Sequence, residues 1–586
     1  MEAEQNHQNV PEGYKVLKEG QASILYKEEK LQADLEGKIR TGKGKRNCTD
    51  QNDTRGTVFY NPVQEFNRDF SILSIREFAK IRQEEKQKKN KDHDGISILE
   101  ALAATGLRSV RYMKEISPIT KLLANDIDST ATELMKKNFD FNNIDPNLYQ
   151  ICTQDAIDVM NLQRMNKTFF DVVDLDPYGT AVPFLESCLN SLADGGLIAV
   201  TFTDMAVLCS RTPHVTFYKY GGSPLNKRYC HEMVSLSVLI FHQALRLVLH
   251  MISQMANRQQ KYIEPLVSLT VDFYVRLFIR VHDGPQKCHS SITKYSHVFQ
   301  CMECESFWTL PFGTHTEQEI TKEPSHKWQK PENINQEDAI KTRQATKKQS
   351  NQNQQEEEKE SEKKLKDKYQ VSRISSIPNR CTVCEGPLAM GGPIWNGKIH
   401  NIEFVQRLLE VARNNSDKTH ADYQKEVKLG TTKRIQAILA AIIDEDQCGE
   451  SPLNWDFSQI SSSLKMQNPK KNELFNAFRS VGSKLTQTYY DPRQYKTDAS
   501  PEVIYDIYRA FKMKECNGDQ DKIFRNINQL GFAHRILSQQ AKIIPNLNGD
   551  PIDGVEKETK KNKKKKYLPN PQPHWGPAAR ATGNKK

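Results

Sequence analysis

The sequence predicts a doubly wound α/β domain with a mostly parallel, seven-stranded sheet, followed by a second, mainly helical α+β domain. Between residues 96 and 202, apolar runs of strand length alternate with segments of helical spacing. That alternation is the pattern of βαβ units, whose strands run parallel. A long apolar segment and a stretch rich in Val, Leu, Phe and Tyr follow, before the chain turns polar.

Each element of the sheet domain is expected from its own spacing of apolar residues. In chain order these are strand 96–103, helix 107–116, strand 121–127, helix 129–142, strand 149–153, a short helix after Asp155, strand 169–175, helix 181–193 and strand 196–202. Helix 229–256 comes next. Residues 265–282 are apolar enough for one or two further strands, which would complete the sheet with an antiparallel edge.

Composition divides the rest of the chain. The expected organisation is a polar N-terminal arm at 1–53, the sheet domain at 54–300, two cysteine pairs within 301–400, a C-terminal domain at 401–545 and a basic disordered tail at 546–586. The arm is expected to pair at most one strand, at its apolar patch 23–26. The insertion at 314–371 is dense in Gln, Asn, Glu and Lys, so it is expected to be disordered. Helices in the C-terminal domain are expected at 403–414, 432–443, 471–484 and 501–512.

Charge and hydrophobicity limit the classes of function. The chain carries 83 Lys and Arg against 73 Asp and Glu, and this modest excess favours a polyanionic partner only where it is clustered. No apolar run approaches the roughly 20 residues needed to cross a bilayer, and the N-terminus lacks the features of a secretory or transit peptide. We therefore expect a soluble intracellular protein without a membrane partner. Nothing in the sequence indicates an obligate protein partner.

Four of the twelve cysteines form two Cys-x-x-Cys pairs, Cys301 with Cys304 and Cys381 with Cys384. In a reducing compartment such pairs indicate metal rather than disulfides, and together they fit a structural four-thiolate zinc site. The long insertion between the pairs costs on the order of 1–2 kcal/mol in loop closure. Binding of a structural zinc ion contributes about 10–16 kcal/mol, so the cost of closing the loop does not prevent the site from forming. A redox pair or unrelated free thiols are the alternatives.

The motif Asp176-Pro177-Tyr178-Gly179 ends the strand 169–175. Ligands of a doubly wound sheet bind at the carboxyl ends of its strands. The Asp176 carboxylate and the Pro177 carbonyl would offer acceptors to the hydrogens of a planar amine, and the Tyr178 ring would offer a flat surface to its base. This pattern suits methylation of a nucleobase amine. The alternative is a strand that simply ends in a Pro-Gly turn.

Three other strand ends carry residues suited to one ligand. Gly106 allows backbone to approach a ligand at a helix start, Asp126 could accept both hydroxyls of a ribose, and Asp155 could accept from an adenine amino group. Helix capping is the alternative for each acid taken singly.

Five motifs then follow one another in the order and spacing of a known family. They are VFYNPVQEFNRD at 58–69, EALAATGLR at 100–108, AND at 124–126, DLDPYG at 174–179 and TFTD at 201–204. In these motifs the chain resembles the tRNA (guanine-26-N2)-dimethyltransferases. The resemblance implies a class I methyltransferase fold that uses S-adenosylmethionine to methylate the N2 amine of a tRNA guanine. Two rounds would give N2,N2-dimethylguanosine, and these residues do not distinguish one round from two.

The resemblance also implies roles for single residues. The cofactor site would comprise Arg68, Gly106, Arg108, Asp126, Asp155 and Ala156. The two arginines would anchor the methionine end of the cofactor, and Asp155 with Ala156 would face its adenine. Phe59 and Tyr178 would stack on the target guanine while Asp176 accepts from its N2 hydrogens. Without the family, a surface salt bridge would be the default for Arg68 and a core position the default for Phe59.

Two segments suggest how RNA could be held. Within the stretch 479–496, three basic side chains interleave with three aromatic ones: Lys484, Arg493 and Lys496 with Tyr489, Tyr490 and Tyr495. This pattern predicts a phosphate-and-stacking surface for RNA. The lysine-rich run 560–566 could be a solvated tail, add phosphate affinity or direct nuclear import. We expect the nucleus, with the cytoplasm or mitochondrion as alternatives.

Two other functional classes stay open at this point. One is a catalytically silent RNA-binding protein or tRNA chaperone that keeps the methyltransferase fold. The other is an amino methyltransferase that acts on DNA adenine or on a protein side chain.

Overall fold

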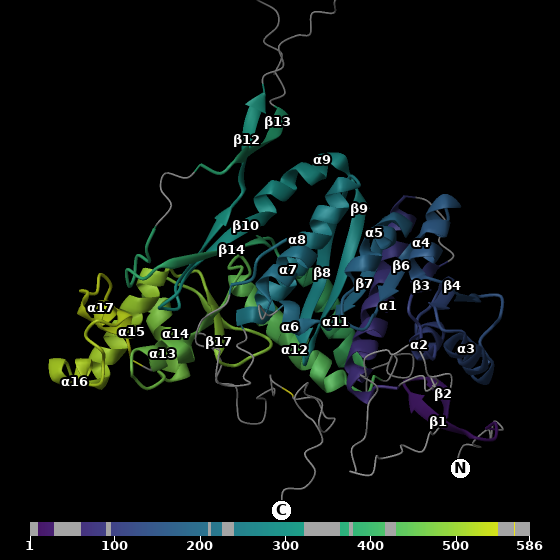
Figure 1. Ribbon diagram of the computed structural model, residues 1–586, viewed down its shortest axis with the longest axis horizontal. Coiled ribbons are helices and arrows are strands. Elements are labelled where there is room, and N and C mark those ends of the chain that lie inside the picture. The colour runs from purple at the N-terminus through teal and green to yellow at the C-terminus, as the bar shows by residue number, and fades with distance from the viewer. Residues whose placement is uncertain are drawn as a thin grey trace, which may run out of the picture.

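The computed structural model describes residues 10–27, 60–89, 95–208, 212–225, 239–320, 364–373, 379–415, 429–548 and 568. A seven-stranded sheet forms its centre, with the spatial order β5-β4-β3-β6-β7-β9-β8 (Figure 1). The strands are β3 (Ile96–Glu100), β4 (Ile119–Asp126), β5 (Tyr149–Thr153), β6 (Phe170–Leu175), β7 (Leu192–Phe202), β8 (Lys261–Val271) and β9 (Tyr274–Asp283). Neighbours from β5 to β7 pair in parallel, whereas β9 is antiparallel to both β7 and β8. The predicted mixed sheet is therefore confirmed.

Helices cover both faces of the sheet, as a doubly wound fold requires. One apolar core lies under α1 (Glu65–Lys88), α2 (Leu107–Glu115) and α3 (Ser129–Phe141). The other core lies under α4 (Ala156–Met165), α5 (Val182–Ser191) and α8 (Leu239–Arg258). The short helices α6 (Met205–Leu208) and α7 (Pro213–Tyr220) follow β7, and α7 contacts α8. No described helix is long and apolar enough to span a membrane.

The N-terminal arm is more ordered than the sequence predicts, because it forms a hairpin of β1 (Tyr14–Glu19) and β2 (Ala22–Lys27). Two asparagines accept hydrogen bonds from backbone N–H groups of β2. Asn138 in α3 accepts through Oδ1 from Leu25 N at 2.7 Å, and Asn142 at the C-terminus of α3 accepts through Oδ1 from Ser23 N at 2.9 Å. Ile24 is fully buried beneath the hairpin. Side chains distant in sequence thus supply the partners that make two strands stable here, which periodicity alone could not show.

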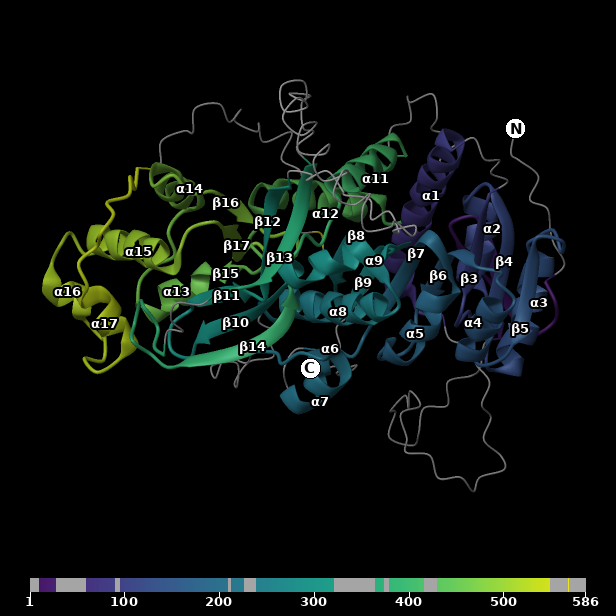
Figure 2. The ribbon, with the colours of Figure 1, turned by 90° about the horizontal axis from the view of Figure 1, so that it is seen from above.

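A three-stranded sheet of β11 (Phe307–Pro311), β10 (Tyr295–Cys301) and β14 (Leu388–Trp395) follows the short elements α9 (Pro285–Cys288) and η2 (His289–Lys294). Figure 2 shows this sheet between the seven-stranded sheet and the C-terminal helices. The predicted disorder of 314–371 is wrong at both of its ends. Strands β12 (Gly313–Ile320) and β13 (Lys364–Val371) pair as a two-stranded ribbon, in which His315 Nε2 lies 2.8 Å from Asp367 Oδ1. Residues 321–363 lie outside the described part of the chain.

All four helices predicted for the C-terminal part are observed, but they belong to two different cores. Helices α11 (Ile402–Asn414) and α12 (Thr432–Glu445) pack into the same apolar core as α1. A separate core holds the remaining elements together with the cysteine pairs. Those elements are β15 (Trp455–Asp456), α13 (Phe457–Ser463), α14 (Lys471–Ser480), β16 (Leu485–Gln487), β17 (Gln494–Thr497), α15 (Pro501–Glu515), α16 (Gln520–Phe524) and α17 (Phe532–Ser538).

Candidate functional site

The carboxyl ends of β3, β4 and β6 lie side by side, because β3 pairs with both of the others. Glu100 at the end of β3 is opposite Ala124 of β4 and Asp174 of β6. The residues that follow these strands therefore converge at one edge, as the sequence predicts. The β4 neighbour on the other side is β5, after which Asp155 stands.

Asp126 and Gly106 shape the turn that faces this edge. Asp126 is half-buried, and its carboxylate accepts from Ala104 N at 2.8 Å and from Asp128 N at 3.0 Å. Gly106 has a φ of 74°, and a Cβ on it would lie 2.6 Å from Cγ of Met135. Only glycine fits this position without displacing α3, so the start of α2 presents bare backbone to the edge.

Asp155 caps α4, where its Oδ1 accepts from Ile157 N at 2.7 Å. The capping alternative is therefore correct for one carboxylate oxygen. The residue itself is exposed, and the adjacent Ala156 is buried at the first turn of α4. Both residues sit at the same edge of the sheet as Asp126. Their role toward an adenine stays a prediction.

Arg108 links the proposed cofactor side to the Asp-Pro-Tyr-Gly motif. Its guanidinium contacts the Asp176 carboxylate and donates to Ser71 Oγ at 3.0 Å. Asp174 lies 3.5 Å from the same guanidinium. Burial by itself would lower the pKa of Arg108, but the carboxylates of Asp174 and Asp176 more than offset this and hold the pKa well above its usual value. Arg108 is therefore a permanent cation that orients Asp176.

Three charged residues behind the motif were not assigned a role from the sequence. Asp174 is fully buried between Tyr112 and Arg276, whose guanidinium donates to it at 2.9 Å. Glu100 is also buried, and this burial raises its pKa to about 8 although Arg108 lowers it. A charged residue inside an apolar strand is the sequence feature that marks both acids. Together they form the support on which Arg108 rests.

Tyr178 and its neighbours differ sharply in exposure. The Tyr178 side chain is 90% exposed, whereas Pro177 is buried and Asp176 is half-buried with 24% of its side chain exposed. Gly179 donates to Thr203 Oγ1 at 2.8 Å, and Thr203 N donates back to Gly179 O at 2.7 Å. The loop is thus held at its base while its aromatic ring is free to stack.

Arg68 is buried and paired, in place of the surface salt bridge that was its alternative. Its Nε donates to Glu19 of the N-terminal hairpin at 2.6 Å, and its guanidinium lies 5.2 Å from the centre of the Tyr60 ring. Arg111 donates to the same Glu19 at 2.8 Å. The hairpin therefore fixes Arg68 in place. Phe59, the second predicted stacking residue, lies outside the described residues.

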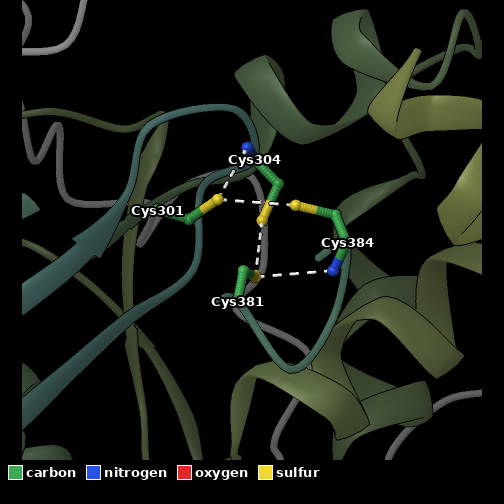
Figure 3. Close-up of side chains that lie close together, drawn as sticks. All are labelled: Cys301, Cys304, Cys381 and Cys384. Atoms are coloured by element: carbon green, nitrogen blue, oxygen red, sulfur yellow. Dashed lines mark hydrogen bonds between the residues drawn. The ribbon is translucent and has the colours of Figure 1, made fainter. Parts of the chain in front are cut away.

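The four predicted cysteines are buried and meet in one cluster (Figure 3), with all sulfur atoms within 4.8 Å of one another. Antiparallel pairing of β10 with β14 places Cys301 opposite Leu388, which brings the two pairs together despite the insertion. A tetrahedral zinc with bonds of about 2.3 Å needs sulfur atoms a little under 4 Å apart. The observed separations of 3.4 Å for Cys301 to Cys384 and 3.6 Å for Cys304 to Cys381 fit such an ion.

The cluster joins two parts of the structure. Tyr505 Oη of α15 accepts from Glu305 N at 3.0 Å, and Arg535 of α17 donates to Cys384 O at 2.7 Å. Since four thiolates complete a tetrahedral shell, a zinc ion here would brace these elements rather than bind a substrate.

Comparison with known proteins bears on the same residues. The sequence matches the family of N2,N2-dimethylguanosine tRNA methyltransferases over residues 38–509. A Drosophila melanogaster tRNA (guanine(26)-N(2))-dimethyltransferase is 32% identical, over 90% of this chain and 85% of its own. A Saccharomyces cerevisiae protein named tRNA (guanine(26)-N(2))-dimethyltransferase, mitochondrial, is 28% identical, over 97% of this chain and 92% of its own.

The chain belongs to the N2,N2-dimethylguanosine tRNA methyltransferase family. A solved structure of Trm1 from Pyrococcus horikoshii with S-adenosyl-L-methionine has the same fold, with a TM-score of 0.56, 21% identity, and coverage of 84% of this chain and 99% of that one. The predicted class I methyltransferase architecture is thereby confirmed.

One prediction for this family member is wrong. The six basic and aromatic residues do not form one continuous RNA surface, because Tyr489, Tyr495 and Lys496 are buried and only Lys484 and Arg493 are exposed. Lys496 is 2% exposed and pairs with Glu445 at 2.8 Å, and Tyr489 accepts from Thr270 N at 2.8 Å. Strand β16 contacts α12, and Tyr489, between β16 and β17, bonds to Thr270 of β8. The buried residues of this segment therefore pack the C-terminal elements against α12 and β8.

Proposed function

We propose that this chain transfers methyl groups from S-adenosylmethionine to the N2 amine of guanine 26 in tRNA, twice, to give N2,N2-dimethylguanosine. Family membership supports the reaction and its substrate. One observation carries the proposal. Arg108 holds the Asp176 carboxylate in place at the end of β6, and the neighbouring Tyr178 has an exposed ring.

The edge of the sheet fits the cofactor. Asp126 would accept from the ribose hydroxyls, and the bare backbone at Gly106 would allow close approach. Arg68 uses Nε and one terminal nitrogen for Glu19 and Asn61, and its other terminal nitrogen bonds no described residue. That nitrogen is free to receive the methionine carboxylate. When bound, S-adenosylmethionine supplies a methyl group on a sulfonium, so positioning is the main task of the protein.

The motif would prepare the amine for attack. The lone pair of an exocyclic amine is delocalised into the base, which makes the nitrogen a weak nucleophile. Asp176 and the Pro177 carbonyl would accept its two hydrogens and favour a tetrahedral nitrogen with an exposed lone pair. A proton must leave after each transfer, and the Asp176 carboxylate would receive it.

The target base must leave its stack to reach this loop, at a cost of a few kcal/mol. Stacking on an aromatic ring returns about 1–3 kcal/mol per contact. The exposed Tyr178 ring would supply one contact, and Phe59, one residue before the described segment that begins at Tyr60, would supply the other.

Incubation of the full-length chain with an unmodified tRNA transcript and labelled S-adenosylmethionine tests this proposal, with the nucleosides identified by mass spectrometry. We expect N2-methylguanosine to appear first and N2,N2-dimethylguanosine to accumulate. Binding of both cofactor and tRNA without either product would refute the enzyme and support the silent RNA-binding alternative. A transcript with adenosine at position 26 is the matched control and should stay unmodified.

We further infer a nuclear location from the run of lysines at 560–566, which lies outside the described residues. The mitochondrial label of the yeast relative makes the mitochondrion the competing location. Fluorescence microscopy of the tagged chain, with and without residues 556–586, distinguishes the two. Nuclear signal that does not depend on those residues would refute this role for the run.

A further inference from the structure

A cavity of about 630 Å³ lies between α7, α8 and η2, and it is not part of the site described above. One face of α8 lines it with Met251, Gln254, Met255 and Arg258. Figure 2 shows α7 beside α8, at the side of the sheet that α5 also covers. The volume is within the range of small-molecule and nucleotide pockets.

The cavity shares a wall with the catalytic loop. Tyr220 lines it, and the Tyr220 hydroxyl lies 2.9 Å from Thr180 Oγ1 and 2.7 Å from Asp204 Oδ1. Val182 also lines it and follows Tyr178 by four residues, so their Cα atoms are at most about 14 Å apart. A strand of RNA that places one base at Tyr178 therefore has its adjacent nucleotides close to the cavity.

The lining combines apolar walls with positive charge. Met251, Met255, Ile292 and Phe312 provide the apolar surface, and two cations line the cavity as well, Lys219 and Arg258. No acidic side chain of the described residues lines it. Methionine and phenylalanine walls accept the flat face of a base, while the cations favour a phosphate.

A buried polar atom in this lining lacks a partner. His250 is 5% exposed, and its Nδ1 makes no hydrogen bond with the described residues. Its ring packs edge-on against Tyr295 with the centroids 4.8 Å apart. Burial lowers the pKa of His250 to about 4, so the imidazole is neutral at physiological pH and can offer a donor or an acceptor to a base edge.

The surface next to the cavity continues the same chemistry. On α7, Phe217 and Tyr218 are 57% and 76% exposed, beside Lys219. Exposed rings next to a cation are the side chains that hold unpaired RNA. Together with Tyr178, they place three exposed aromatic rings near one end of the sheet.

We propose that this cavity binds an unpaired nucleotide of the tRNA that neighbours the target guanine, with its base between the apolar walls and its phosphate at Lys219 and Arg258. This inference rests on the proposed function in taking tRNA as the partner. Enclosing a second base would hold the strand splayed open and so favour the flipped position of the guanine.

A charge reversal tests the phosphate contact. Arg258→Glu should weaken tRNA binding about three- to tenfold near physiological salt and lower the salt slope by about 1. Arg164→Glu is the matched control, because Arg164 also stands in the last turn of an exposed helix end, on α4. Equal effects of the two variants on affinity and slope would mean that only general charge was changed, and would overturn the proposal.

A footprint tests the occupant directly and does not depend on catalysis. In Gln254→Cys, iodoacetamide should modify the introduced thiol in the free protein, and saturating tRNA should abolish this modification, as followed by peptide mass spectrometry. Arg164→Cys should stay reactive with and without tRNA. If iodoacetamide still modifies position 254 in the presence of tRNA while the protein methylates tRNA, the proposed nucleotide binding in the cavity is refuted and the proposed function stands. Protection there without any methylated guanosine would instead refute the proposed function and leave the cavity assignment standing.

Discussion

Replacing Asp176 by asparagine tests the chemistry most sharply, because the substitution keeps the size of the side chain. It removes the negative charge that faces Arg108 and turns one acceptor oxygen into a donor. A donor that points at the N2 amine cannot accept its hydrogen. The side chain is 24% exposed, so solvent screens this interaction only in part.

Loss of one preorganised electrostatic contact typically lowers kcat by about 10²–10³, or about 2.7–4 kcal/mol of transition-state stabilisation. We expect a decrease of that size for Asp176→Asn. Cofactor affinity should change by less than about threefold, which is below about 1 kcal/mol. The reason is that Arg108 keeps its contacts with Asp174, Ser71 and Glu100 when Asp176 loses its charge.

Single-turnover methylation at saturating tRNA measures the first quantity, and calorimetric titration of S-adenosylmethionine measures the second. Asp171→Asn is the control: Asp171 stands near the start of the same strand and pairs with Arg82 at 3.1 Å. It should leave kcat unchanged. If Asp176→Asn lost cofactor binding, the residue would belong to the cofactor site, and unaltered kcat would refute its role in preparing the amine.

Three further outcomes follow from the structure. Cys381→Ser should reduce bound zinc from one ion per chain to none and lower the melting temperature, as measured by metal analysis and calorimetry; a full zinc complement would contradict the four-thiolate site. In urea unfolding, Gly106→Ala should destabilise the fold by more than the roughly 1–2 kcal/mol cost of a positive φ, because its Cβ would meet Met135 at 2.6 Å. Gly482→Ala is the control: Gly482 has a φ of 77° and open space around it, so this variant should show only the backbone cost. The pKa of Glu100 is raised to about 8 in the folded chain, so its neutral form stabilises the fold at low pH and that stability is lost as pH rises toward and through 8. Glu100→Gln should therefore flatten the loss of stability between pH 5 and 8, and an unchanged pH profile would place Glu100 in a more polar environment.

Much of the candidate site could be predicted from the sequence because it depends on local features. Apolar periodicity located each parallel strand of the central sheet, and the order of βαβ units placed Asp126 and Asp176 at the same edge. The cysteine spacing likewise indicated the metal cluster, whose sulfur atoms the structure brings within 4.8 Å. These inferences needed only the direction of the strands and the identity of the residues that follow them.

Other features depend on contacts between segments that are distant in the chain. The local sequence predicts that Lys496 is a surface cation. In the structure Lys496 is buried and pairs with Glu445, which lies 51 positions earlier in the chain. Glu19 had no expected role, yet it fixes Arg68 from a hairpin that itself depends on the asparagines of α3. Burial of a charge is tolerated only where a partner meets it, and no local pattern shows which partner that is.

The sequence by itself determined the class of fold, the residues at the strand ends, the four cysteines suited to a zinc ion and the resemblance to the family. Tertiary structure alone decided that Arg108 holds Asp176, that Lys496 and two tyrosines of the basic and aromatic segment are buried, and that α7, α8 and η2 line a cavity beside the Asp-Pro-Tyr-Gly loop. The physical reason is range: strand periodicity and ligand spacing are set within a few residues, whereas charge pairing, burial and cavities arise only when segments far apart in the chain pack together.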